Sequence, residues 1–202
     1  MGGRSATLSL RTSTPQNAKP QNERPITMKL HQRPFRHYIT AEAIQARVAE
    51  LGTQIGADYQ GRRPVWLGVL NGAFVFAADL ARACPADGDW QFVTLASYHG
   101  MTTTGKVETV LGLRIDIADR DVIIVEDIVD TGTTLHRFMD ELRSKKPASL
   151  ALAAMFVKRD AMKYPIQIDY VGFEIPSAFV VGYGLDYDGL GRGLRDLYQL
   201  DE

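Results

Sequence analysis

Residues 126–134 combine side chains that could bind a phosphorylated sugar: two adjacent carboxylates, a third carboxylate, a glycine and three threonines. They follow a short β-branched run and precede an amphipathic helix, so they lie where the carboxyl end of a parallel strand binds ligands. The backbone N–H groups and hydroxyls of residues 130–134, at the positive end of that helix, predict a phosphate site. Glu126 and Asp127 would repel a phosphate, but they can bind neighbouring hydroxyl groups or a magnesium ion. The pattern therefore indicates a sugar that carries both a phosphate and vicinal hydroxyls.

This segment differs from two common phosphate-binding motifs. It has no lysine where a P-loop requires one, and it lacks the glycine spacing of a dinucleotide-binding fingerprint. A structural alternative is that Glu126 and Asp127 are solvated residues at a strand end and that the threonines only cap the helix. The Gly/Thr loop attached to the acidic pair favours a binding site over this alternative.

The hydrophobic spacing predicts the elements that position the segment. A helix is expected after the N-cap Thr40, with an apolar stripe at Ile44, Val48, Leu51 and Ile55. Further helices are expected over residues 73–84 and after Thr134. Short apolar runs predict strands over residues 65–70, 90–97, 122–125, 150–157, 170–175 and 179–182. Strands alternating with helices predict an α/β fold with an open, mainly parallel sheet flanked by helices.

Length and composition limit the class of protein. A chain of 202 residues without an internal repeat suits one domain. The single cysteine, Cys84, excludes a disulfide framework and is typical of a reducing compartment, so we expect a cytoplasmic protein. The longest apolar run, residues 150–157, is far shorter than the roughly 20 residues that span a bilayer, which argues against a membrane protein.

The near-zero net charge is an average over two unlike regions. Residues 1–36 hold seven Lys/Arg against one acid and have no apolar period, which predicts a disordered basic tail. A transit peptide and a working start at Met28 are alternative interpretations of this tail. Residues 37–202, the predicted folded domain, hold 16 Lys/Arg and 23 Asp/Glu. This acidic balance argues against nucleic acid as a partner.

Residues 122–135, VIIVEDIVDTGTTL, closely resemble the phosphoribosyl-pyrophosphate (PRPP) binding motif of type I phosphoribosyltransferases. Four further segments narrow the resemblance to the hypoxanthine-guanine phosphoribosyltransferases. They are VLNGAFVFAADL (69–80), SYHGMTTTG (97–105), FVKR (156–159) and FEIPSAFVVGYGLDYDGLGRGL (173–194). The resemblance implies a purine-salvage enzyme that forms IMP or GMP and pyrophosphate. It also implies the type I fold, with a small hood built from N- and C-terminal segments, and a homodimer or homotetramer.

The resemblance assigns the PRPP side of the site residue by residue. Glu126 and Asp127 would bind the ribose hydroxyls, directly or through Mg²⁺, and Asp186 would hold Mg²⁺ through water. Asp130 would be the general acid/base for the imidazole nitrogen that does not accept the ribose. The 5′-phosphate would be bound by Asp130, Thr131, Gly132, Thr133 and Thr134, and the pyrophosphate by Leu70, Asn71, Gly72 and Arg192.

The resemblance also assigns the purine side. Lys158 would donate to the 6-oxo group, Phe179 would stack on the ring, and Ile128 and Val180 would contact the base. Without the resemblance, Lys158 fits a snorkelling surface residue and Phe179 a core residue. Residues 98–108 match the mobile lid of the family, in which Ser97 and Tyr98 would close over the substrates to exclude water.

Several alternatives stay open at this point. Many relatives carry a lysine where this chain has Asn71, so only the backbone contacts of that turn are expected. Arg195 is a rival of Arg192 for the pyrophosphate, although the spacing from Asp186 favours Arg192. Xanthine or another base could be the acceptor, and some proteins of this fold are nucleotide-sensing regulators that bind nucleic acid.

Overall fold

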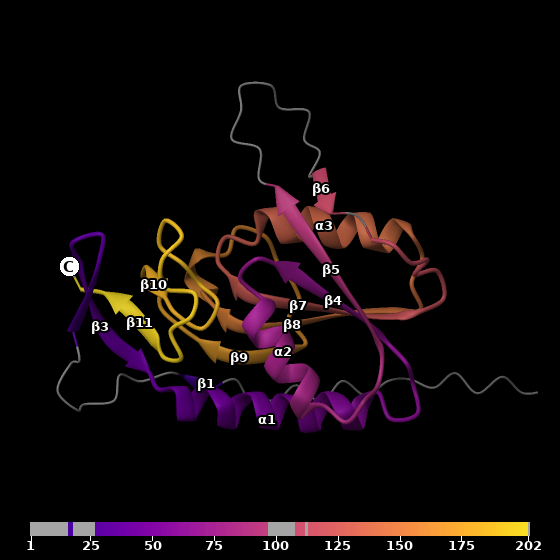
Figure 1. Ribbon diagram of the computed structural model, residues 1–202. Helices are drawn as coiled ribbons and strands as arrows, with labels where there is room; N and C mark the ends of the chain where they lie inside the picture. The colour runs from indigo at the N-terminus through magenta and orange to yellow at the C-terminus, as the bar shows by residue number, and fades with distance from the viewer. Residues whose placement is uncertain (1–15, 18–26, 97–107, 112, 202) are drawn as a thin grey trace, which may run out of the picture.

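The computed structural model describes residues 16–17, 27–96, 108–111 and 113–201, which form two sheets with helices packed on the larger one (Figure 1). The larger sheet has seven strands in the order β1-β9-β8-β7-β4-β5-β6. Every neighbouring pair is parallel except β5 and β6. The strands are β1 Gln16–Asn17, β4 Val65–Leu70, β5 Asp89–Ala96, β6 Glu108–Leu111, β7 Asp121–Val129, β8 Ser149–Val157 and β9 Tyr170–Glu174. The predicted mainly parallel sheet is confirmed.

Helices cover both faces of this sheet. Helices α1 (Ala41–Asp58) and α2 (Phe74–Ala83) lie on one face and α3 (Thr133–Ser144) on the other (Figure 1). A short 3-10 helix follows β8 at Arg159–Ala161. Thr40 caps α1 as predicted, because its hydroxyl accepts a hydrogen bond of 3.1 Å from the N–H of Ala43. Among the described residues, no helix is long and apolar enough to cross a membrane.

Strand β7 extends beyond its predicted end at Val125. It pairs with β4 only as far as Val125, opposite Gly68, but with β8 as far as Val129, opposite Val157. Glu126 and Asp127 therefore lie within the strand and not in the loop that follows it. The order of strands reverses between β4 and β7. At this switch point the end of β7 has no pairing with β4, and a crevice opens there.

The four-stranded second sheet is the predicted hood. Its order is β10-β11-β3-β2, from β2 Thr27–Leu30, β3 Arg33–Ile39, β10 Val180–Val181 and β11 Leu197–Leu200. It lies beyond the carboxyl ends of the central strands (Figure 1) and has its own core of Phe35, Val181 and Tyr198. Strand β2 and most of β3 precede residue 37, so the prediction of a disordered tail is wrong for residues 27–36. The remaining residues of the predicted tail, 1–15 and 18–26, lie outside the described residues.

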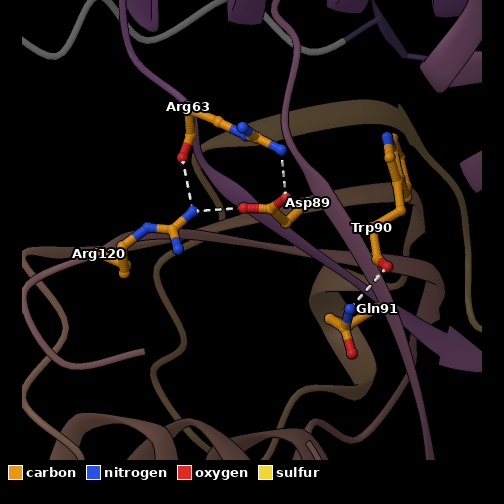
Figure 2. Close-up of polar contacts among 5 residues, drawn as sticks. All are labelled: Arg63, Asp89, Trp90, Gln91 and Arg120. Carbon is orange, nitrogen blue, oxygen red and sulfur yellow. Dashed lines mark hydrogen bonds and ion pairs between the residues drawn. The ribbon is translucent and has the colours of Figure 1, made fainter. Parts of the chain in front are cut away.

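An ion-pair cluster joins the amino ends of the strands, opposite the crevice (Figure 2). Asp89, which begins β5, accepts hydrogen bonds from Arg63 at 2.8 Å and from Arg120 at 2.7 Å. Arg120 also donates to the carbonyl of Arg63 at 3.1 Å. The hydrogen bond from Arg120, followed by that from Arg63, lowers the pKa of Asp89. The cluster therefore links the segments that lead into β4, β5 and β7 at the end of the sheet away from the crevice.

Candidate active site

A cavity of ≈ 280 Å³ opens at the carboxyl ends of β4 and β7. It brings together the predicted residues Leu70, Glu126, Ile128 and Asp130 and the threonine loop, defined here as residues 131–134. Its lining is Val69, Leu70, Leu95, Glu126, Ile128, Val129, Asp130, Thr131, Gly132, Thr133, Thr134 and Leu135. The cavity thus places an acidic strand end beside a loop that opens a helix, as the sequence indicated.

The threonine loop presents the N-terminus of α3 to this cavity. Gly132 has φ +72° at the N-cap position, and no side chain caps the helix there. The hydroxyls of Thr131 and Thr133 lie 3.3 Å apart, and the carbonyl of Thr131 accepts from the N–H of Lys163 at 3.0 Å. The N–H of Thr133 donates to the Thr131 hydroxyl at 3.5 Å. First-turn N–H groups, together with the helix dipole, form an anion site. The loop is therefore suited to a phosphate.

Glu126 and Asp127 form a partly dehydrated acidic pair. The Oε2 atom of Glu126 is buried and has no hydrogen-bond partner among the described residues. Asp127 Oδ1 accepts from the N–H of Ile128 at 2.8 Å. Burial, and then the negative charge of Asp127, raise the pKa of Glu126 well above its ordinary value. Burial also raises the pKa of Asp127, against an opposing effect of the Ile128 N–H. A buried acceptor without a partner fits a hydroxyl or a cation.

The turn after β4 packs directly on this acidic pair. The Leu70–Asn71 peptide bond is cis. A Cβ atom at Gly72 would overlap the carboxylate of Asp127, so only glycine permits this approach. The side chain of Asn71 is exposed. The backbone of the predicted pyrophosphate turn therefore lies against the predicted ribose-binding strand.

The C-terminal loop, defined here as residues 182–194, completes this side of the site. Gly184 has φ +98°, and a Cβ atom there would overlap the carbonyl of Gly72. Arg192 donates to the carbonyl of Gly184 at 2.8 Å and pairs with Asp186 at 2.5 Å. The charge of Arg192 also opposes the rise in the pKa of Asp127. Arg192 is thus held beside the acidic pair, whereas the side chain of Arg195 is exposed.

The predicted magnesium ligands do not form one cluster. Among the described residues there is no group of three or more His, Cys, Asp or Glu side chains that could hold a metal ion. Glu126 has the unpartnered oxygen described above, but Asp186 accepts from the N–H of Gly189 at 2.8 Å besides its pair with Arg192. The acidic pair therefore fits a cation better than Asp186 does.

The predicted base-binding residues fall into two groups. Lys158, only 8% exposed, lies with its Nζ 2.7 Å from Asp130 Oδ2. Phe179 is 44% exposed on the hood, with its ring 5.3 Å from that of Tyr187, while Val180 is buried. Of the predicted base-binding residues, Ile128 lines the cavity, whereas Lys158, Phe179 and Val180 lie outside its lining. Ser97 and Tyr98 lie outside the described residues.

Sequence reasoning missed the residues that hold the C-terminal loop. The hydroxyl of Tyr183 donates to Asp79 of α2 at 2.8 Å, and Gly184 makes the close approach to Gly72. The signals available were the glycines on both sides of Tyr183 and an acid inside the apolar helix sequence of α2.

Comparison with known proteins assigns this arrangement to a class. Residues 38–188 match the model of the phosphoribosyl transferase domain. The chain therefore contains a phosphoribosyl transferase domain.

Named relatives and solved structures narrow the class. A hypoxanthine-guanine phosphoribosyltransferase of Mycobacterium tuberculosis is 46% identical over 170 residues, which cover 81% of this chain and 84% of the relative. A hypoxanthine-guanine phosphoribosyltransferase of Aquifex aeolicus is 39% identical, and the match covers 80% of this chain and 92% of the relative. The crystal structure of one from Bacillus anthracis, with HEPES in its active site, matches at TM-score 0.77 and 38% identity, covering 82% and 98%. The chain belongs to the hypoxanthine-guanine phosphoribosyltransferase family.

We expect Glu126→Gln to stabilise the protein at neutral pH. The folded-state pKa of Glu126 is raised, so stability is lost as pH rises from the unfolded pKa through the folded one. A glutamine does not ionise and escapes this loss. Thermal unfolding should give equal Tm values at about pH 4 and a higher Tm for the variant at about pH 8. A variant Tm at or below the wild-type value at about pH 8 would contradict a raised pKa of Glu126 in the folded protein.

Proposed function

We propose that this chain transfers the phosphoribosyl group of PRPP to the 6-oxopurines hypoxanthine and guanine, and that the residues above carry the reaction. The observation that carries the choice of base is the Lys158–Asp130 pair, with Nζ and Oδ2 2.7 Å apart. A 6-oxopurine places an oxygen acceptor next to an imidazole nitrogen. A buried lysine donor beside a carboxylate acceptor is complementary to these two groups, whereas a 6-aminopurine would place a donor against the lysine.

PRPP is proposed to bind across the switch point of the sheet. The threonine loop would bind the 5′-phosphate, and Glu126 and Asp127 the ribose hydroxyls. The backbone of the Asn71-Gly72 turn, together with Arg192, would bind the pyrophosphate. The close packing of Gly72 on Asp127 supports this arrangement, because it holds the ribose and pyrophosphate contacts at a constant separation.

The transfer replaces the bond between the anomeric carbon and pyrophosphate by a bond to the purine nitrogen. Asp130 would take or return the proton of the other imidazole nitrogen, while Lys158 donates to the 6-oxo group. When bound with PRPP, Mg²⁺ held by Glu126 and Asp127 would neutralise charge on the departing pyrophosphate. Little covalent chemistry falls to the protein, so positioning and electrostatic stabilisation would supply most of the rate.

Two further properties are part of the proposal. The exposed rings of Phe74 and Phe92, 44% and 43% accessible, suit a homodimer or homotetramer. The free and buried thiol of Cys84 suits a cytoplasmic location. The lid role of Ser97 and Tyr98 and a water-mediated magnesium contact at Asp186 remain predictions.

The experiment that tests the function is a panel of acceptor bases. Purified protein with PRPP and magnesium would be given hypoxanthine, guanine, xanthine, adenine or uracil in turn, and pyrophosphate release would be followed. We expect release with hypoxanthine and guanine and none with adenine or uracil. Release with xanthine alone would reassign the base, and no release with any oxopurine would refute the function.

Asp130→Asn tests the acid/base assignment. The amide keeps the size of the side chain but cannot take a proton, so we expect kcat to fall by about 100-fold or more. The Kd for PRPP, measured by calorimetry without base, should change by less than about threefold. A kcat within about tenfold of wild type would remove Asp130 from this role.

A further inference from the structure

The C-terminal loop is attached to helix α2 by one polar contact that reaches across a cavity. The cavity, ≈ 380 Å³, lies between α1, α2 and this loop, and its lining includes Gln45, Val75, Asp79, Tyr183 and Arg192. Beside this cavity Tyr183 packs in the main hydrophobic core, with its ring 6.4 Å from that of Phe156. The contact is the hydrogen bond of 2.8 Å from the Tyr183 hydroxyl to Asp79 Oδ2.

Asp79 is itself held in place by its neighbours. Its Oδ2 also accepts from Gln45 of α1 at 2.6 Å, and its Oδ1 pairs with Arg82 one turn along α2. Tyr183 is almost fully buried, at 2% exposure, and has φ +48°, a backbone conformation that a bulky residue adopts only where its surroundings enforce it. The partly buried carboxylate of Asp79 thus holds the side chain of a residue whose backbone conformation is unfavourable.

The residue that follows Tyr183 carries this constraint to the pyrophosphate side. Gly184 lies against the carbonyl of Gly72, and its own carbonyl accepts from Arg192 at 2.8 Å. Its N–H donates to the carbonyl of Arg192 at 3.0 Å. Helix α2 begins directly after the turn that contains Gly72. Asp79 therefore connects the two segments that would bind pyrophosphate, one at the start of its own helix and one across the cavity.

We propose that Asp79 and Tyr183 are positioning residues for the pyrophosphate group of PRPP: their hydrogen bond sets the position of Gly184 and Arg192 relative to the Asn71-Gly72 turn. The inference rests on the proposed function. Neither residue touches the substrate, and both act through the C-terminal loop. Loss of the bond would loosen the pyrophosphate contacts and leave the base contacts of Lys158 and Asp130 unchanged.

The test is Tyr183→Phe, which keeps the ring and removes only the hydroxyl. We expect KM for PRPP, and KM for pyrophosphate in the reverse reaction, to rise about tenfold, while KM for hypoxanthine changes by less than about twofold. Asp79→Asn keeps an uncharged acceptor, so we expect its KM for PRPP and for pyrophosphate to rise as well, but by less. It also provides the test if Tyr183→Phe does not fold.

The matched control is Tyr170→Phe. Tyr170 of β9 also donates to a helix aspartate, Asp58 of α1, at 2.9 Å, but at the end of the sheet away from the site. We expect this variant to lose stability without a change in any KM. The inference is overturned if Tyr183→Phe leaves KM for PRPP and pyrophosphate within about twofold of wild type. It is also overturned if all three KM values rise together, or if the control behaves in the same way.

Calorimetric binding of pyrophosphate separates this inference from the proposed function. The measurement needs no turnover, so it applies even if wild-type protein fails the base panel. Weaker pyrophosphate binding by Tyr183→Phe than by Tyr170→Phe supports the positioning role, and equal binding refutes it.

Discussion

The site depends on three closely packed segments, in which the Asp127 carboxylate lies against Gly72 and the carbonyl of Gly72 lies against Gly184. The three residues come from the central strand, from the turn after its neighbour and from the C-terminal loop, so contacts distant in sequence determine the geometry. Because protein interiors are close-packed, a shift in one layer must move the others. The positions of Asp127, Gly72 and Gly184 are therefore set as one unit.

The acidic pair beside Gly72 is energetically unfavourable in the absence of a ligand. Glu126 and Asp127 are adjacent, and burial raises both pKa values. Strand β7 no longer pairs with β4 after Val125, and Glu126 Oε2 has no hydrogen-bond partner among the described residues. A buried polar atom that lacks a hydrogen-bond partner until a ligand binds is typical of a binding site. Arg192, fixed by Gly184 and Asp186, opposes the effect of burial on Asp127.

The sequence predicted the elements whose signal is local. The spacing of Ile44, Val48, Leu51 and Ile55 predicted α1, and the β-branched run at 122–125 predicted the start of β7. The end of β7 was wrong because carboxylates usually mark a strand end, whereas Glu126 continues to pair with Ala154 of β8. Strands β2 and β11 were missed because they have only four residues each, and β3 was missed because it contains Pro34 and two arginines. Their pairing, such as Leu197 with Ile39, joins the two ends of the domain. Asp79 and Tyr183 lie inside two of the quoted motifs, but their contact was not predicted, since it depends on the folded position of the C-terminal loop.

The most direct test of this account is PRPP binding by Gly72→Ala, measured by calorimetry. The added Cβ must displace the short Asp127 side chain, which can move without unfolding the protein. Gly193→Ala is the matched control, because a Cβ there meets nothing within 4 Å. The account predicts at least about tenfold weaker PRPP binding by Gly72→Ala, with the control equal to wild type. Wild-type PRPP affinity in a folded Gly72→Ala variant would contradict it.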